Sequence, residues 1–210
     1  MTKAARVDPA LAWAYYAIDP VAFCADQLNV ALDPWQVAVM RALADPSTAR
    51  VMVRSCHGPG KTRVAACAIL WAGLTWGRTR IPCTAPKLDS LTEKLWPEIN
   101  KILLRAEPEI RAVVEWQATR LVFFGQPGWA AHADTAAHPE GLAGHHEDRV
   151  LAVVEEASGV DESFWPVLEG ALTTAGSKLL AISNPTRDTG AFARAFRRNR
   201  DGERLFQVGW

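Results

Sequence analysis

The order of apolar and polar positions along the chain predicts an α/β protein. Short apolar runs that are typical of buried strands occur at 51–53, at 150–154 and at 178–182, and a further strand is expected to end in the segment 82–86. Longer segments with apolar residues at helical spacing separate these runs. This order is typical of a mainly parallel central sheet with helices on both faces.

The predicted helices lie between and before these strands. The segment 9–32 is rich in Ala, Trp and Tyr and is expected to be helical, and a second helix is expected to begin at Asp33-Pro34 and to include 37–43. The apolar run 64–76 predicts a third helix. A fourth, amphipathic helix is expected over 87–105, because apolar residues recur there at helical spacing, at Leu88, Leu91, Leu95, Ile99 and Ile102.

The remaining segments have weaker patterns. Two β-rich runs, 112–116 and 120–124, predict a hairpin at the edge of the sheet. The stretch 125–148 is rich in Gly, Ala, Pro and His, has little periodicity and is expected to be a loop near the active site. Because no repeat and no linker divides the chain, we expect one domain over 1–210, with a helical lead-in over 1–32.

Composition narrows the class of protein without choosing a function. The chain has 210 residues, of which 49% are hydrophobic, and its acidic and basic residues are equal in number, so we expect one sizeable core and no overall attraction to nucleic acid or membranes. The four cysteines form no Cys-x-x-Cys pair, which argues against a zinc site or a disulfide framework. The run 64–76 is too short to span a bilayer and no secretory signal is present, so a cytoplasmic protein is expected.

The first chemical signature is a phosphate-binding loop between the strand at 51–53 and the next helix. Gly58 and Gly60 let backbone N–H groups approach phosphate oxygens closely, and the helix directs its N-terminus toward the same place. Lys61 would reach the β- and γ-phosphates of ATP, and Thr62 would offer its hydroxyl to Mg²⁺. The residues expected to bind the nucleotide are Ser55, which stands where the pattern has its first glycine, Cys56, His57, Gly58, Pro59, Gly60, Lys61, Thr62 and Arg63.

The second signature is a pair of carboxylates, Glu155 and Glu156, directly after the strand at 150–154. Ligands gather at the carboxyl ends of strands in open parallel sheets, so the pair is expected beside the phosphate loop. Glu155 would hold Mg²⁺, usually through water, and Glu156 would polarise the water that attacks the γ-phosphorus. If Glu156 held the metal instead, the position of the base would fall to Ala157, whose methyl side chain cannot accept a proton, so this alternative assignment fails. The alternative interpretation is a solvated strand end with two acidic residues.

A third polar group, Ser183-Asn184-Pro185, follows the strand at 178–182. The amide of Asn184 is a candidate to touch the γ-phosphate or the attacking water, and so to report whether hydrolysis has occurred. Taken alone, this tripeptide is also typical of an ordinary turn.

Local charge gives the chain a candidate surface for DNA. The segment 187–204 contains three acidic residues and six arginines, namely Arg187, Arg194, Arg197, Arg198, Arg200 and Arg204. Clustered positive charge is sufficient for contact with the phosphate backbone, but a solvated helix face or a contact with another domain would have the same pattern. One of these arginines, or Arg54 or Arg63, is a candidate for a finger that stabilises the transition state. The five histidines, at 57, 132, 138, 145 and 146, lack zinc spacing, so no metal site is expected from them.

Together these motifs resemble the ATPase part of the large terminase subunit of tailed bacteriophages, from about residue 33 to residue 196. The resemblance implies a P-loop NTPase fold of the ASCE type, similar to RecA, and a motor that hydrolyses ATP to drive double-stranded DNA through the portal into an empty capsid. The segments that carry it are, in chain order, 33–36, 55–62, 84–86, 140–146, 155–160 and 183–186, with Gly190 and Phe192.

The resemblance also implies roles and partners. Trp35 and Gln36 would contact the adenine, and Asn184 would belong to the motif that couples hydrolysis to DNA movement, while Lys61, Thr62 and Glu156 would have the roles given above. The implied partners are double-stranded DNA, the portal protein, the small terminase subunit and further copies of the chain in a homo-oligomeric ring. No membrane is involved, and the implied location is the cytoplasm of the infected bacterium, with transient docking on the procapsid.

The chain departs from that family in two respects. Such terminases usually have Asp where this chain has Glu155, whose extra methylene moves the carboxylate by roughly a bond length. Because Mg²⁺ has a strict coordination geometry, slower turnover is expected. The family normally continues into a nuclease domain, and this sequence contains no later acidic cluster for a two-metal site, so no nuclease activity is expected from this chain.

Other functions fit parts of the sequence. A helicase-like DNA-dependent ATPase has the same loop and carboxylate pair, and Ser55 and Glu155 would also suit a nucleotide-binding module with weak or no hydrolysis. A small-molecule phosphotransferase is disfavoured by the paired carboxylates at the strand end. A dinucleotide-binding protein is disfavoured because Lys61 to Arg63 follow Gly60 without the third glycine of that fingerprint.

Overall fold

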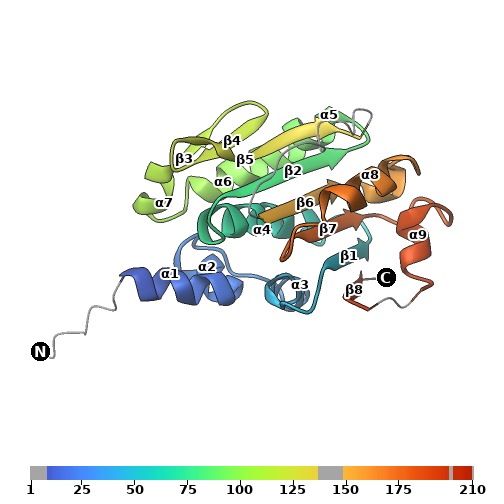
Figure 1. Cartoon of the computed structure of the whole chain (residues 1–210), viewed down its shortest axis with the longest axis horizontal. Coiled ribbons are helices and arrows are strands. Elements are labelled where there is room, and N and C mark those ends of the chain that lie inside the picture. The colour runs from blue at the N-terminus through green and yellow to red at the C-terminus, as the bar shows by residue number, and fades with distance from the viewer. Residues whose placement is uncertain (1–8, 137–148, 199–200, 210) are drawn as a thin grey trace, which may run out of the picture.

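The computed structural model describes residues 9–136, 149–198 and 201–209, which form an eight-stranded sheet with helices on both faces (Figure 1). The strands lie in the order β3-β4-β5-β2-β6-β7-β1-β8. Their bounds are β1 Arg50–Ser55, β2 Thr79–Ala85, β3 Val114–Trp116, β4 Arg120–Phe123, β5 Gln126–Thr135, β6 Arg149–Glu155, β7 Lys178–Ser183 and β8 Glu203–Val208. The fold class predicted from the sequence is confirmed.

The sheet is mainly parallel, as predicted. The neighbouring strands β5, β2, β6, β7, β1 and β8, taken in their order across the sheet, pair in parallel. The pairs β3 with β4 and β4 with β5 are antiparallel. The apolar run 150–154 lies in β6 and is buried throughout, because helices cover both faces of the sheet there. The predicted hairpin is present as β3 and β4 at the edge, although its first two residues belong to the preceding helix α7 (Pro108–Val113).

One face of the sheet is covered by helices that come early in the chain. They are α1 (Pro9–Ile18), α2 (Pro20–Asp26), α3 (Pro34–Ala44), α4 (Lys61–Thr75) and α6 (Trp96–Leu103). Residues 64–74 of α4 are all buried, because this helix lies between the sheet and the other helices of its layer. α5 (Leu88–Ser90) and η1 (Leu91–Leu95), a π-helical segment, lead directly into α6, so the predicted amphipathic helix over 87–105 is confirmed.

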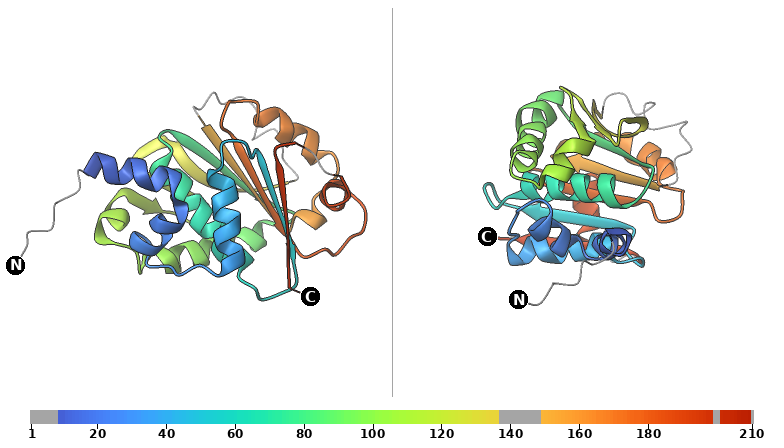
Figure 2. Two further views of the ribbon diagram at one scale, coloured as in Figure 1. Left: turned by 90° about the horizontal axis from the view of Figure 1, so that it is seen from below. Right: turned by 90° about the vertical axis from the view of Figure 1, so that its left-hand side faces the viewer.

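The opposite face is covered by elements from the second half of the chain: η3 (Ala157–Gly159), α8 (Phe164–Ala171) and α9 (Ala191–Ala195). Phe164, Leu168 and Phe192 pack there against Val154 and Ala181 of the sheet. Figure 2 shows the sheet between the two helical layers. No helix in the described part of the chain is both long enough and apolar enough to cross a membrane.

Three segments differ from the sequence-based prediction. Residues 27–32, expected to be helical as part of 9–32, follow the end of α2 and belong to no helix. Residues 126–135, expected to be part of a loop over 125–148, form β5, which pairs with β2 on one side and β4 on the other. Its Pro, Gly, Ala and Asp have low strand propensity, so the flanking strands determine its conformation. The rest of that loop, 137–148, lies outside the described residues. β8, which no pattern predicted, pairs in parallel with β1.

The register of the parallel strands brings the predicted chemical segments to one edge of the sheet. Ile182 of β7 lies beside Val53 of β1 and beside Glu155 of β6, and Thr84 of β2 lies beside Val154. The phosphate loop after β1, the carboxylates at the end of β6 and Asn184 after β7 therefore meet at the carboxyl ends of neighbouring strands.

Candidate nucleotide-binding site

The phosphate loop connects β1 directly to α4. Gly58 and Gly60 both have φ of +92°, a left-handed conformation that favours glycine. Gly60 has a second constraint, because a Cβ atom there would lie 2.7 Å from Nε2 of Gln36. α4 begins at Lys61 without a side-chain cap, so the N–H groups of its first turn point out of the helix toward the loop. These N–H groups are suited to bind an anion.

Ser55 explains why the first glycine of the pattern is dispensable. It is the last residue of β1, is fully buried, and has no left-handed backbone conformation that would require glycine. Its hydroxyl oxygen lies 3.1 Å from Nζ of Lys61 and accepts a hydrogen bond from it. Ser55 thus supports the loop lysine with a side chain that glycine lacks.

The Lys61 ammonium group is the centre of the site. Besides Ser55, it donates to the carbonyl oxygen of Cys56 and to Oδ1 of Asn184, both at 2.6 Å. Burial lowers the pKa of Lys61, and the nearby Glu155 carboxylate opposes that shift. The lysine is thus held by three oxygen atoms at a place where the phosphate oxygens of a nucleotide would be favourable partners.

Glu155 ends β6 as a buried carboxyl group. Burial raises the pKa of Glu155 to about 7, the neighbouring charge of Glu156 adds to the rise, and Lys61 and Lys94 oppose it. Its Oε1 atom is buried and has no hydrogen-bond partner among the described residues. An unpartnered carboxylate oxygen is a ligand that Mg²⁺ prefers, so Glu155 fits the predicted role of metal ligand, together with Thr62 in the first turn of α4.

Glu156 has a different environment from its neighbour. It lies one residue beyond β6 with φ of +51°, an uncommon conformation for a residue other than glycine, and its side chain is half-exposed. Its Oε1 atom accepts a hydrogen bond from Nζ of Lys94 at 2.8 Å. Burial acts to raise the pKa of Glu156, but hydrogen bonds from Lys94 and Ser90 and the charges of Lys94 and Lys87 outweigh it, so the pKa lies below its usual value. At neutral pH this carboxyl group is ionised and able to accept a proton.

Asn184 joins the end of β7 to the phosphate loop. Its Oδ1 atom faces Lys61, and its Nδ2 atom lies 2.8 Å from Nε2 and 3.1 Å from Nδ1 of His57. The segment after β6 is tied to the segment after β7 as well, since Ser158 accepts hydrogen bonds from Thr186 and from the backbone of Arg187, each at 3.1 Å.

Trp35 and Gln36, expected at the adenine, lie at the start of α3. Gln36 is fully buried. Its Oε1 atom accepts from the backbone N–H of Asp33 at 2.9 Å, and its Nε2 atom donates to the carbonyl oxygen of Gly60 at 3.0 Å. Gln36 therefore connects the start of α3 to the phosphate loop, and the adenine contact of both residues stays a prediction.

Sequence reasoning missed two parts of this site. Lys94, the partner of Glu156, lies in η1, and no motif in the sequence singled it out. The contact between His57 and Asn184 was missed because these residues come from loops after different strands. In each case the residues are far apart in the chain, and no local pattern indicated the contact.

Most of the arginines that are candidates for a transition-state finger already contact other residues in the described structure. Arg54 donates to Oε1 of Gln207, at 3.1 Å from its Nε, and its guanidinium lies 4.5 Å from the ring centre of Phe196. Arg63 lies 3.9 Å from a carboxylate oxygen of Glu98. Arg194 pairs with Glu162, Arg204 lies 3.9 Å from Asp45, and Arg197 donates to the carbonyl oxygen of Asp188. Arg200 lies outside the described residues, as do His138, His145 and His146.

Arg54, Arg187 and Arg197 line one pocket of about 580 Å³ beside the segment that follows Asn184. We call it the arginine pocket. Phe192 and Phe196 provide its apolar wall, and the main opposing charge is Asp188. The arginine cluster predicted from the sequence is thus divided, with some of its members in ion pairs and others around this pocket.

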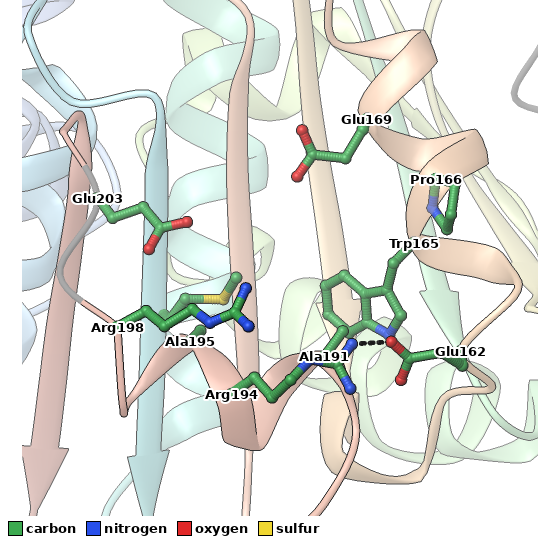
Figure 3. Close-up of a pocket in the computed structure, with 10 residues that line it drawn as sticks. Glu162, Trp165, Pro166, Glu169, Ala191, Arg194, Ala195, Arg198 and Glu203 are labelled. Carbon is green, nitrogen blue, oxygen red and sulfur yellow. Dashed lines mark hydrogen bonds and ion pairs between the residues drawn. The ribbon is translucent and has the colours of Figure 1, made fainter.

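A further pocket lies between α8, α9 and β8, and none of the residues that line it belongs to the phosphate loop. In Figure 3, Arg194 points toward Glu162, and the indole of Trp165 lies beside this pair. Glu169, which also lines this pocket, pairs with Arg50. The lining of this pocket thus carries three glutamates and two arginines, Arg194 and Arg198. Among the described residues, no group of three or more potential metal-binding side chains of His, Cys, Asp and Glu is present.

Comparison with known proteins shows what the chain as a whole is similar to. No family model matches the sequence. A protein of Enterobacteria phage P7 named "Probable terminase, large subunit" is 26% identical over 185 residues, which cover 85% of this chain and 37% of that protein. The chain thus spans little more than a third of the length of this relative.

Solved structures of large terminases have the same fold. The ATPase domain of the Thermus phage P74-26 large terminase matches with a TM-score of 0.67 at 19% identity, over 86% of this chain and 82% of that domain. The HK97 bacteriophage large terminase matches with a TM-score of 0.64 at 20% identity, over 85% and 39% of the two chains. The large terminase of a thermophilic bacteriophage, in complex with ADP, matches with a TM-score of 0.60 at 14% identity, over 85% and 45%. The resemblance predicted from the sequence is confirmed.

Proposed function

We propose that this chain, which has the fold of large-terminase ATPase domains, is the ATP-hydrolysing part of a DNA-packaging motor. The observation that carries this proposal is the convergence of a phosphate loop, a carboxylate pair and Asn184 at one edge of the sheet, with Lys61 between them. The similarity to a phage protein named as a probable terminase supports the choice of packaging over other uses of the same chemistry.

ATP would bind with its phosphates on the N–H groups of the loop and of the first turn of α4, and with Lys61 near the β- and γ-phosphates. Thr62 and Glu155 would hold Mg²⁺, which, when bound, neutralises part of the triphosphate charge. Because the buried Oε1 atom of Glu155 lacks a hydrogen-bond partner among the described residues, a cation there would compensate its burial.

Glu156 would serve as the base. Its ionised carboxylate accepts a proton from a water molecule, whose oxygen forms a bond to the γ-phosphorus while the bond from that phosphorus to the bridging oxygen breaks, giving ADP and phosphate. Nζ of Lys94 donates a hydrogen bond to one oxygen of this carboxylate. The lone pairs that remain on the carboxylate are available for the water.

Coupling to DNA movement would begin at Lys61. Its present partners Ser55 and Cys56 belong to the loop, but Asn184 belongs to the end of β7. A γ-phosphate that replaces Asn184 as an acceptor for Lys61 would release the segment after β7, which forms one wall of the arginine pocket. Nucleotide state would thereby alter a basic surface that is suited to contact DNA phosphates.

The partners of the packaging complex belong to the same proposal. Double-stranded DNA, the portal protein, the small terminase subunit and further copies of the chain in a ring would assemble with it in the cytoplasm of the infected cell. DNA binding through the arginine pocket would weaken strongly as salt concentration rises, because it depends on phosphate contacts.

An ATPase assay with and without duplex DNA tests this function. We expect phosphate release that DNA stimulates and that Lys61→Ala and Glu156→Gln both abolish. Absence of hydrolysis in the wild-type chain, with nucleotide still bound, would favour a binding module that does not hydrolyse ATP. Stimulation by DNA without any dependence of DNA transport on portal and procapsid would favour a helicase-like ATPase.

A further inference from the structure

Gln36 is a buried amide that bonds to the phosphate loop from the start of α3. Its Nε2 atom donates to the carbonyl oxygen of Gly60 at 3.0 Å, and its Oε1 atom accepts from the backbone N–H of Asp33 at 2.9 Å. Each end of the amide therefore has a backbone partner. One partner precedes α3 and the other ends the phosphate loop, so a single side chain links the two segments.

Burial distinguishes Gln36 from its neighbour Trp35. Gln36 has 0% of its surface exposed, whereas Trp35 is half-buried. A glutamine reads adenine by offering both a donor and an acceptor to the edge of the base. Both groups of Gln36 are bonded to the backbone, and neither reaches the surface. In this arrangement Trp35 can meet a base and Gln36 cannot.

The carbonyl group that Gln36 holds lies where the loop becomes a helix. The same oxygen of Gly60 accepts the backbone N–H of Val64 at 3.2 Å, at the start of α4. In a planar trans peptide, the N–H of the next residue points opposite to the carbonyl. Fixing the carbonyl of Gly60 therefore fixes the direction of the N–H of Lys61, which points out of the first turn toward the loop.

The fit between the two residues is close. A Cβ atom on Gly60 would lie 2.7 Å from Nε2 of Gln36, and the φ of +92° at Gly60 also favours glycine. The loop thus leaves room for the amide at the residue to which the amide bonds. Because this contact involves the backbone of the loop, it acts on every ligand that binds there through phosphate groups.

We propose that Gln36 is a positioning residue for the phosphate loop and does not read the base. It holds the carbonyl of Gly60, and thereby directs the N–H of Lys61 toward the phosphates. This inference rests on the proposed ATPase function, and for Gln36 it replaces the adenine contact that the resemblance implies. Affinity gained from a loop that is already in its binding conformation depends on the phosphate chain, so it is the same for every base.

Three ligands separate a loop-positioning residue from a base-reading residue. They are ATP-γ-S, GTP-γ-S and inorganic tripolyphosphate, which has neither base nor ribose. Gln36→Met has nearly the same size but no amide. We expect it to raise the Kd of all three ligands, measured by calorimetry with Mg²⁺, by the same factor of about five, the effect of one lost hydrogen bond. An unchanged Kd for tripolyphosphate would overturn the proposal, as would a loss of affinity for ATP-γ-S alone.

A matched control and a second variant complete the test. Gln27, at the end of α2, bonds to Tyr16 and Glu107 and not to the loop. Gln27→Met should leave all three Kd values unchanged, and a loss equal to that of Gln36→Met would contradict a specific role for Gln36. Gln36→Asn keeps the amide but withdraws it by one methylene, which covers the case in which Gln36→Met does not fold. It should weaken all three ligands by one common factor, and a change confined to ATP-γ-S would overturn the proposal.

A readout without ligand distinguishes failure of this inference from failure of the proposed function. In ¹H–¹⁵N spectra of the chain without nucleotide, the backbone signal of Lys61 should move in Gln36→Met, because its N–H shares a peptide with the carbonyl of Gly60. It should not move in Gln27→Met. An unmoved Lys61 signal in Gln36→Met would overturn the contact itself. If the wild-type chain binds none of the three ligands, the proposed function fails, and this spectrum still decides whether Gln36 holds the loop.

Discussion

Replacement of Glu155 by glutamine should stabilise the folded chain, and the gain should grow with pH. Burial holds the pKa of this carboxyl group at about 7, against an ordinary value of 4.5. At a pH below the ordinary pKa of 4.5, the group is protonated in both the folded and the unfolded chain. Between the two values only the folded chain holds the proton, so stability decreases as pH rises. Above about 7 the ionised group is buried at its full cost.

The expected magnitude follows from these values. At about 1.4 kcal/mol for each pH unit, the rise of the pKa from 4.5 to about 7 corresponds to a penalty of about 3 kcal/mol in the free energy of unfolding at pH 8. No reduction for solvent screening applies, because the side chain is buried. Glutamine has nearly the same shape and no charge, so Glu155→Gln should remove most of this penalty.

Urea unfolding at pH 5, 6, 7 and 8, without nucleotide or Mg²⁺, measures the effect. The difference in unfolding free energy between Glu155→Gln and the wild type should increase by about 2.5 kcal/mol from pH 5 to pH 8, because a small part of the penalty is already present at pH 5. Glu156→Gln is the comparison variant and should show a smaller gain, because it removes only the contribution of the Glu156 charge to the pKa of Glu155 and leaves the larger contribution of burial. A difference for Glu155→Gln that does not vary with pH would refute the reasoning that burial raises this pKa.

The remaining predictions concern the metal ligand, the base and the core. Glu155→Asp should leave ATPase activity equal or higher, since aspartate is usual at this position in the terminases that the chain resembles; a large loss of kcat would reject Glu155 as the metal ligand. Lys94→Met should raise the pKa of Glu156 and so move the acidic limb of the kcat–pH profile to higher pH, and an unmoved limb would show that Lys94 does not tune this carboxylate. Gly73→Ala in α4 should cost about 1–3 kcal/mol in urea unfolding, because its Cβ would lie 2.2 to 2.6 Å from three ring atoms of Phe123. Gly170→Ala in α8, where a Cβ meets nothing within 4 Å, is the control and should be neutral or stabilising, and equal effects at the two sites would contradict the packing argument.

Much of the fold was predictable because three of its central strands contain continuous apolar runs. β1, β6 and β7 contain the apolar runs 51–53, 150–154 and 179–182, each followed by polar residues, and this pattern indicates buried strands whose ends carry chemistry. β5 was not predictable in the same way. Its sequence is typical of a loop, and its strand conformation depends on hydrogen bonds from β2 and β4, which local patterns do not report.

The site was predictable as far as its backbone is concerned. The positions of Lys61, Glu155 and Asn184 follow from the strands that they adjoin, because parallel strands bring their carboxyl ends to one edge. The environments of these side chains were not predictable. The raised pKa of Glu155 depends on burial, and the lowered pKa of Glu156 depends on Lys94 from a distant helix. Two adjacent residues of the same type therefore differ in a way that only three-dimensional packing explains.

The most direct test of the central claim is phosphate release by the purified chain in the presence of MgATP, with and without duplex DNA. The account predicts hydrolysis that DNA stimulates, that Lys61→Ala abolishes through loss of phosphate contact, and that Glu156→Gln abolishes while nucleotide still binds. Undiminished hydrolysis in Glu156→Gln would contradict the assigned base, and undiminished hydrolysis in Lys61→Ala would contradict the assigned nucleotide site.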